Sequence, residues 1–156
     1  MAECRDFFYP SADGRTQIHA RCWQPEGAPR AVVQIAHGIC EHIGRYDAFA
    51  RWLAERGFLV VANDHPGHGQ SWQEPERKGL FAETGGWQLA VGEMEALRRR
   101  TAEAWPDVPY FLLGHSMGSF LARLYAVKYP HTVDGVVIHG SAGPNHAVPL
   151  GRAVSK

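Results

Sequence analysis

The stretch that decides the fold is Pro109–Gly118, with the sequence PYFLLGHSMG. An apolar run breaks into the pattern Gly-x-Ser-x-Gly and continues directly into a helix-like pattern. A serine at the tip of such a strand-to-helix turn has a strained backbone that exposes its hydroxyl, and the flanking glycines let strand and helix approach each other. The pattern therefore predicts a nucleophile elbow, with Ser116 as the nucleophile.

Outward from this stretch, the apolar periodicity alternates between that of strands and that of helices. Strands are expected at 6–10, 16–24, 31–36, 58–62, up to 113, and at 135–139, and helices from 46 to 57, from 87 to 104 and from 117 to 130. The first two strands, joined by the turn signal at 11–14, should pair antiparallel at one edge. The later strands are apolar on both faces and separated by helices, which predicts a mostly parallel sheet with helices on both faces. The predicted fold class is α/β.

Composition excludes several function classes. The chain has 156 residues, with 16 Lys plus Arg against 16 Asp plus Glu, so no net field favours nucleic acid or an anionic membrane. Its three cysteines are odd in number and lack C-x-x-C spacing, which indicates a reducing compartment, and the cytoplasm is the expected location. The N-terminus lacks the apolar core of a signal peptide, and no apolar run is long enough for a membrane helix.

Two further motifs precede the elbow: His37–Tyr46, HGICEHIGRY, and Asn63–Ser71, NDHPGHGQS. In order and spacing the three motifs resemble the α/β-hydrolase superfamily across nearly the whole chain. Within it they resemble the monoacylglycerol lipase and lysophospholipase branch, often labelled serine aminopeptidase-like. Glu41-His42 followed by Gly44-Arg45-Tyr46 is the more specific part of this resemblance. The resemblance implies the strand order 1-2-4-3-5-6 and an acyl-enzyme mechanism without a metal or other cofactor.

The segment His37–Ile39 follows a buried strand, so its backbone turns at the carboxyl end of the sheet, on the same rim as Ser116. Acyl transfer places negative charge on one oxygen of the transition state. Removal of one backbone donor to that oxygen typically costs about 3 to 4 kcal/mol. The resemblance implies that the two donors are the N–H groups of Ile39 and Met117. A plain loop role for Ile39 is the alternative.

Clustered histidines allow a second interpretation. Asp64, His65 and His68, with His37 and His42 nearby, have side chains that suit zinc. The preferred interpretation is structural: the glycines and Pro66 shape a tight turn, and the histidines hydrogen-bond the backbone under the site. The helix with Trp87, Met94 and Trp105 is assigned to packing. Cys40 is either an exposed reactive thiol or a tolerated small residue, and we favour the second.

A serine nucleophile needs a general base and an acid that orients it. Only 40 residues follow Ser116, and the resemblance places the acid and the histidine after two further strands. Asp134 should lie at the opposite rim, and His139 near the active rim but beside the elbow. The other candidates are His131 and His146.

The chain is therefore expected to be the N-terminal part of a single α/β-hydrolase domain, residues 1–156, truncated after the sixth strand. Residues 140–156 are expected to begin the lid region. The strand 135–139 would be an open apolar edge through which the isolated chain associates with itself.

The sequence thus predicts a serine hydrolase that cleaves carboxylic esters of single-chain lipids, a monoacylglycerol or a lysophospholipid. Little turnover is expected from residues 1–156 alone. The alternatives are a non-catalytic or partner-complemented fragment, and an aminopeptidase of the same fold. Its ligands should be small-molecule or lipid esters, with no nucleic acid and no integral membrane segment.

Overall fold

The computed structural model describes residues 3–72 and 74–143. The strands are β1 (Glu3–Pro10), β2 (Gln17–Gln24), β3 (Ala31–Ala36), β4 (Phe58–Asn63), β5 (Tyr110–His115) and β6 (Gly135–His139). The α-helices are α1 (Asp47–Ala54), α2 (Gly86–Ala104) and α3 (Met117–Lys128), and the short 3₁₀ helices are η1 (Ile43–Tyr46) and η2 (Pro75–Arg77).

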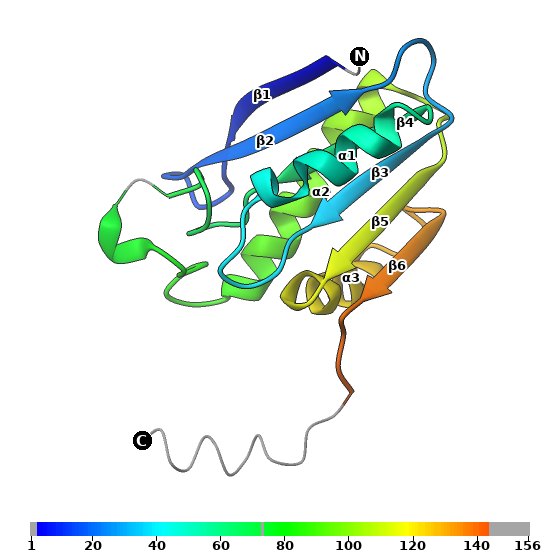
Figure 1. Cartoon of the computed structure of the whole chain (residues 1–156). Coiled ribbons are helices and arrows are strands. Elements are labelled where there is room, and N and C mark those ends of the chain that lie inside the picture. The colour runs from blue at the N-terminus through cyan, green and yellow to red at the C-terminus, as the bar shows by residue number, and fades with distance from the viewer. Residues whose placement is uncertain (1–2, 73, 144–156) are drawn as a thin grey trace.

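The strands form one sheet in the order β1-β2-β4-β3-β5-β6, which confirms the expected order (Figure 1). The β1–β2 and β2–β4 pairs are antiparallel, and the three pairs from β4 to β6 are parallel. Ala36 at the end of β3 faces Gly114, and His115 at the end of β5 faces His139. The carboxyl ends of these parallel strands therefore meet at one rim, and the elbow continues from it.

Helices cover both faces of the sheet, and the alternation of side chains along β4 shows how. Leu59 and Val61 lie in one core with Leu97 of α2, whereas Val60 and Ala62 lie in another core with α1. Successive strand residues point to opposite faces, so a strand that is apolar at every position can fill both cores. The predicted α/β class and the helix cover of both faces are confirmed.

Two expectations on the helices need correction. The helix expected from residue 46 begins as η1, and α1 itself ends at Ala54, three residues before Gly57. The helix that carries Trp87 is expected to serve packing, and it does so through its buried residues, but Trp87 itself is 46% exposed. It lies in the first turn of α2, whereas the buried stripe of this helix begins at Ala90 and includes Met94, as expected. An aromatic residue therefore marked the start of the helix rather than its core face.

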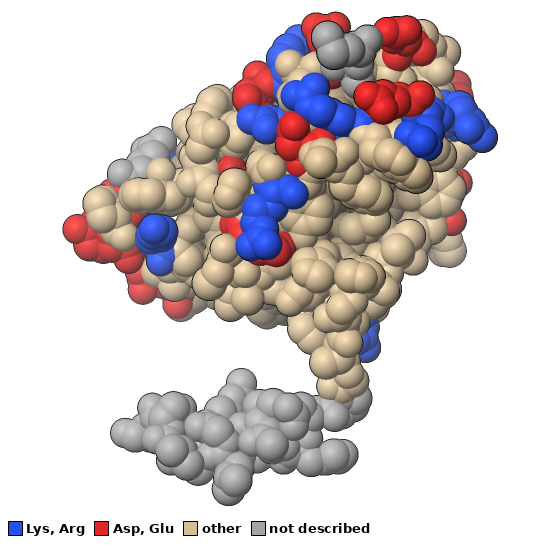
Figure 2. Space-filling view, viewed as in Figure 1, with Lys and Arg blue, Asp and Glu red and all other residues tan. Residues whose placement is uncertain are grey.

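The far edge of the sheet is apolar and exposed. Val137 is 51% and Ile138 is 41% exposed on β6, the edge strand of the described sheet. On α3, Val127 is 81% exposed while Leu121 and Tyr125 are buried. Figure 2 shows intermixed acidic and basic side chains over the face that carries α1 and the N-terminal strands, and mostly uncharged surface towards β5 and β6.

We predict that a polypeptide of residues 1–156 associates through the β6 edge, because unpaired backbone groups on an apolar edge strand template further pairing. Val137→Lys should weaken this association about tenfold or more, since charged side chains oppose pairing at an edge. Sedimentation velocity over a concentration series measures it. The control Gln88→Lys adds the same charge on the exposed face of α2 and should change nothing. A monomeric species with a sharp, reversible unfolding transition would contradict the prediction.

A buried carboxylate connects α2 to the β1–β2 turn. Glu93 is 1% exposed, and its Oε1 accepts hydrogen bonds from Ser11 Oγ at 2.8 Å and from Ala12 N at 2.9 Å. Tyr9 donates its hydroxyl to the Glu93 carbonyl oxygen at 3.0 Å. Burial raises the pKa of Glu93 above its ordinary value, and the two hydrogen bonds only partly oppose this shift.

Glu93 should make the free energy of unfolding fall as the pH rises. Its pKa is raised in the folded state, so its contribution is complete below about pH 4.5 and is lost as the pH passes the folded pKa. Glu93→Gln should therefore lose less stability than the wild type between about pH 4.5 and pH 8. Urea unfolding at a series of pH values measures this difference. Glu103→Gln, an exposed change on the same helix, should follow the wild type, and equal pH slopes for all three proteins would refute the assignment.

Candidate active site

Ser116 lies at the point where β5 passes into α3. Its backbone has φ 52° and ψ −119°, a left-handed conformation that a residue with a side chain rarely adopts. Ser116 N donates to the carbonyl oxygen of His139 at 2.9 Å, and Ser119 donates both its N–H, at 2.9 Å, and its hydroxyl, at 2.6 Å, to the Ser116 carbonyl oxygen. The strained turn is thus fixed from β6 on one side and from α3 on the other.

The glycines of the Gly-x-Ser-x-Gly pattern are required by close backbone approach. A Cβ atom on Gly118 would collide with the carbonyl groups of Ala36 and His37, and one on Gly114 would collide with the carbonyl of Gly118. Any side chain at these positions would push α3 away from the ends of β3 and β5. The expected strand-turn-helix geometry of the elbow is therefore present.

The loop after β3 lies against the elbow. A Cβ atom on Gly38 would come within 3.2 Å of Ser116 Cβ. Gly38 N donates to Glu41 Oε2 at 2.8 Å, and the Tyr46 hydroxyl donates to the same oxygen at 2.7 Å. Ile39, the next residue, is 63% exposed. The loop is therefore held at Gly38 by a carboxylate clamp, here called the Glu41–Tyr46 clamp.

Electrostatics keep the Glu41 carboxylate of the clamp ionised as an acceptor and the Tyr46 hydroxyl protonated as a donor. Burial acts to raise the pKa of Glu41, but hydrogen bonds from Tyr46 and from Gly38 N outweigh it, so that this pKa is lowered. Burial and the neighbouring carboxylate both raise the pKa of Tyr46, which keeps its phenol protonated as a donor. Arg45 Nε lies 3.7 Å from Glu41 Oε1 and adds a positive charge. The clamp therefore persists over the neutral pH range.

His37 holds the other side of the same peptide unit. Its Nε2 accepts a hydrogen bond from His65 N at 3.0 Å, so its proton is on Nδ1, which donates to the Gly38 carbonyl oxygen at 2.8 Å. Burial lowers the pKa of His37 to about 4 and keeps the ring neutral. A neutral ring of fixed tautomer is what this bridge between two loops requires.

The other histidines of the described part of the chain have no arrangement that suits a metal ion. His68 hydrogen-bonds the Pro66 carbonyl at 3.0 Å, which agrees with the structural interpretation. His65 differs, because both of its ring nitrogens are buried without a hydrogen-bond partner, with the ring 4.1 Å from that of His37 between centroids. Within residues 3–72 and 74–143, no group of three or more His, Cys, Asp or Glu side chains could hold a metal ion.

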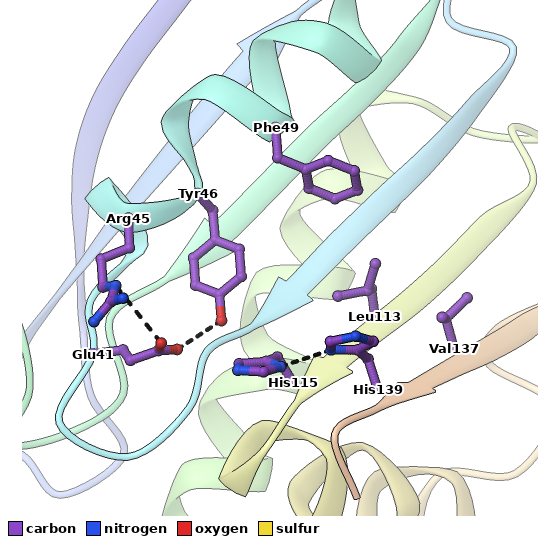
Figure 3. A pocket seen from close by; sticks show the side chains of 8 residues that line it. All are labelled: Glu41, Arg45, Tyr46, Phe49, Leu113, His115, Val137 and His139. Carbon is purple, nitrogen blue, oxygen red and sulfur yellow. Dashed lines mark hydrogen bonds and ion pairs between the residues drawn. The ribbon is translucent and has the colours of Figure 1, made fainter.

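A groove of about 480 Å³ opens beside the elbow (Figure 3). It is lined by Glu41, Arg45, Tyr46, Phe49, Leu113, His115, Val137 and His139. The charged groups of the clamp lie at one end, and the apolar side chains lie towards β5 and β6. The rings of His115 and His139 lie side by side, with their Nδ1 atoms 2.8 Å apart. The groove is therefore amphiphilic.

The described candidates for the acid and the base do not hydrogen-bond the Ser116 side chain. Asp134 accepts a hydrogen bond from Tyr110 N at 2.7 Å at the start of β5, on the rim opposite the elbow, as expected. His139 lies at the active rim, but its ring is paired with His115. Among the described residues no histidine ring hydrogen-bonds the Ser116 hydroxyl, and His146 falls outside them. Most of the expected lid region, residues 144–156, also falls outside the described residues.

Sequence reasoning missed the function of two parts of this site. Glu41 and Tyr46 were noted only for their place in a motif, although their spacing brings both side chains to one loop. The buried hydrogen bond between His19 and Asp64 joins residues 45 positions apart, and no local pattern signals it.

No helix in the described part of the chain is both long and apolar enough to cross a membrane.

Comparisons with known proteins agree with this geometry. Residues 27–155 match the family described as serine aminopeptidase, S33. The chain is 40% identical over 128 residues to the monoglyceride lipase of Mus musculus, which covers 82% of this chain and 40% of that protein. It is 35% identical over 145 residues to the monoacylglycerol lipase of Mycolicibacterium smegmatis, 92% of this chain and 50% of that protein.

Among solved structures, a thermostable carboxyl esterase from Bacillus coagulans in complex with glycerol superimposes with a TM-score of 0.88 at 32% identity. The match covers 99% of this chain and 49% of the esterase. The chain thus spans about half the length of the relatives it matches. With its strand-turn-helix elbow, the Gly38 loop beside it and its strand order in place, the chain belongs to the serine aminopeptidase S33 family of α/β hydrolases.

Proposed function

We propose that this protein is a serine hydrolase of carboxylic esters, in which Ser116 is the nucleophile and the backbone N–H groups of Ile39 and Met117 stabilise the oxyanion. The observation that carries the proposal is the left-handed Ser116 at the start of α3, with the Gly38 loop packed against it. Met117 is the first residue of α3, so its N–H has no partner within the helix and is free to donate to an anion. Ile39 follows Gly38, whose position the Glu41–Tyr46 clamp and His37 fix.

In the proposed reaction, Ser116 Oγ attacks the ester carbonyl carbon and its proton passes to a histidine base. The carbonyl oxygen becomes an oxyanion that accepts from the two amides, and the alcohol leaves with the proton from the histidine. Water then attacks the acyl-enzyme by the reverse proton path and releases the acid. By resemblance, the histidine and its acid belong to the part of the fold that follows β6.

The proposed substrates are esters with one acyl chain, a monoacylglycerol or a lysophospholipid. Such molecules have a polar head and an apolar tail, and the groove beside Ser116 has a charged end and an apolar end. The names of the mouse and mycobacterial relatives support the same class. The family description favours an aminopeptidase as the second candidate, and turnover of an amide rather than of the matching ester would select it.

The remaining expectations on partners and location stay as proposals. We propose a cytoplasmic protein without a metal or other cofactor. The free state of Cys4, Cys22 and Cys40 supports a reducing compartment. Self-association through β6 is proposed for residues 1–156 alone.

Ser116 should react with a fluorophosphonate probe in the full-length protein. We expect one covalent adduct on the peptide that carries Ser116, read by mass spectrometry, and none in Ser116→Ala. The matched variant Ser119→Ala loses a hydroxyl in the same helix turn and should keep the adduct. Residues 1–156 alone should label far more slowly, because an oxyanion hole without a working triad retains only about 10³ to 10⁴ over water. Labelling of another residue, or equal labelling of Ser116→Ala, would refute the nucleophile.

Loss of the Glu41 carboxylate should slow acylation without unfolding the protein. Glu41→Ala leaves Gly38 N and the Tyr46 hydroxyl without their shared acceptor, so the loop with the Ile39 donor becomes less well placed. We expect a fall of about 10- to 100-fold in the rate of fluorophosphonate labelling. Tyr46→Phe keeps the acceptor of Gly38 and should give a smaller fall, and Glu55→Ala, at the exposed residue that follows α1, should give none. A Glu41→Ala rate equal to that of the wild type would show that the clamp does not position the loop.

A further inference from the structure

A buried charged cluster that the proposed mechanism does not use lies at the same rim as the elbow. His19 in β2 has a side chain that is 2% exposed. Its Nδ1 lies 2.7 Å from Oδ2 of Asp64, the residue that follows β4. Its Nε2 lies 3.0 Å from Oδ1 of Asp6, a residue of β1. The Asp64 side chain is 2% exposed and that of Asp6 is 45% exposed. One imidazole thus bridges an inner and an outer carboxylate.

Hydrogen-bond accounting fixes the charge of this imidazole. Arg21 donates to both oxygens of Asp6, at 2.6 and 2.9 Å, so Asp6 is ionised. Asp64 accepts from Ile43 N at 2.8 Å and from Gln70 N at 2.9 Å in addition to His19, so it is ionised as well. Ionised carboxylates only accept hydrogen bonds, so both ring nitrogens of His19 must donate. His19 in this geometry is an imidazolium.

Asp64 is also the origin of one connection to the Gly38 loop. The next residue along the chain, His65, donates its N–H to His37 Nε2, and His37 Nδ1 donates to the Gly38 carbonyl oxygen. Gly69 must be a glycine, because a Cβ atom there would collide with the Asp64 carboxylate. The carbonyl of Gly38 is therefore positioned through a path that starts at Asp64.

A second connection reaches the N–H of the same glycine. Asp64 Oδ1 accepts the N–H of Ile43, the first residue of η1, and η1 ends at Tyr46. Tyr46 donates to Glu41, which accepts the N–H of Gly38. Both hydrogen-bonding groups of Gly38 are thus held by paths that begin at Asp64, one through the backbone N–H of the next residue and one through the buried carboxylate, and His19 supplies the positive charge beside that carboxylate.

Resting on the proposed function, we propose that the His19 imidazolium is a positioning residue for the ester site. It holds Asp64 and, through Asp64, the Gly38 loop. Loss of one of its protons at alkaline pH therefore slows attack by Ser116. The proton that leaves is the one on Nε2, because it faces the half-exposed Asp6, whereas Nδ1–H faces the buried Asp64. The buried Asp64 carboxylate then loses its counter-charge, and the Asp6 carboxylate faces a nitrogen lone pair. A buried charge without a counter-charge is energetically costly, so Asp64 is held less firmly and both paths to Gly38 become less well ordered.

The charged and titratable groups around His19 come from every neighbouring element. They are Asp6 of β1, Arg21 of β2, Asp64 after β4, Asp47 of α1, which lies 3.7 Å from Arg21, and His42, which lines one cavity with His19. Burial acts to lower the pKa of His19, but the two carboxylates outweigh it and raise this pKa above 6.5. The contribution of the imidazolium is therefore complete below about pH 6.5 and is lost as the pH rises through the folded pKa.

The first test measures the charge of His19 directly in the full-length protein. Nitrogen-15 NMR of the histidine side chains, assigned with His19→Gln, should show a His19 with two protonated ring nitrogens at neutral pH. The Nε2 proton should be lost only above about pH 6.5, the ordinary pKa of a histidine. A His19 that is neutral at pH 7 would overturn the proposal. This readout does not require that the protein hydrolyse an ester.

The second test measures the coupling to the site. The rate of fluorophosphonate labelling of Ser116 should fall about tenfold as the pH rises into the alkaline range. The midpoint of this fall should equal the pKa that NMR gives for His19. His19→Gln should label at the lower rate at every pH and lack this fall. Asp6→Asn, a change at the exposed end of the cluster, should leave the protein folded and move the fall in labelling rate to lower pH. The labelling rate of His131→Asn should match that of the wild type at every pH.

An alkaline fall of the same size and pKa in His19→Gln would overturn the coupling, even where the protein labels normally. Circular dichroism at each pH separates this result from unfolding. If Ser116 fails to label in the wild type at every pH, the proposed hydrolase function fails, and the coupling fails with it. The NMR titration still shows in that case whether His19 is the charged bridge.

Discussion

The backbone of α3 begins directly against the end of β3, because Gly118 has no side chain where the carbonyl groups of Ala36 and His37 lie. This close approach accompanies the left-handed φ of 52° at Ser116, two residues before Gly118. It also brings the Gly38 loop against the serine. The strained serine and the loop beside it therefore meet at one backbone contact on the carboxyl rim of the sheet, where the proposed nucleophile and oxyanion site lie.

Histidine serves this rim in two opposite charge states, and the hydrogen-bond partners decide which. His37 bridges a backbone N–H and a carbonyl oxygen, which requires one proton, and burial keeps it neutral. His19 bridges two carboxylates, which requires two protons. The glutamates differ in the same way: the pKa of Glu41 is lowered by its donors, while the pKa of the more buried Glu93 is raised. Burial together with the local donors and acceptors, rather than residue type, sets the charge states of these side chains.

The parallel sheet and the elbow could be predicted from apolar periodicity and glycine spacing, and the strand order was implied by the family resemblance that the three motifs carry. The packing role of the helix that carries Trp87 could be predicted, but the exposure of Trp87 itself could not, since periodicity marks an apolar residue but not the turn at which a helix reaches the sheet. Glu41 and His19 were not assigned their functions, because the contacts that define them depend on how separate loops meet. The His19–Asp64 bond joins residues 45 positions apart and exists only once β2 has paired with β4. Whether Ile39 and Met117 donate to an oxyanion remains a proposal.

The central claim is that Ser116 and two backbone amides form one acyl-transfer site. A crystal structure of the full-length protein with a phosphonate bound covalently to Ser116 tests it most directly. The account predicts that one phosphonyl oxygen lies about 2.7 to 3.1 Å from both Ile39 N and Met117 N, with the Glu41–Tyr46 clamp still closed on Gly38. An adduct whose oxygens point away from these amides, or one bound through another side chain, would contradict the account.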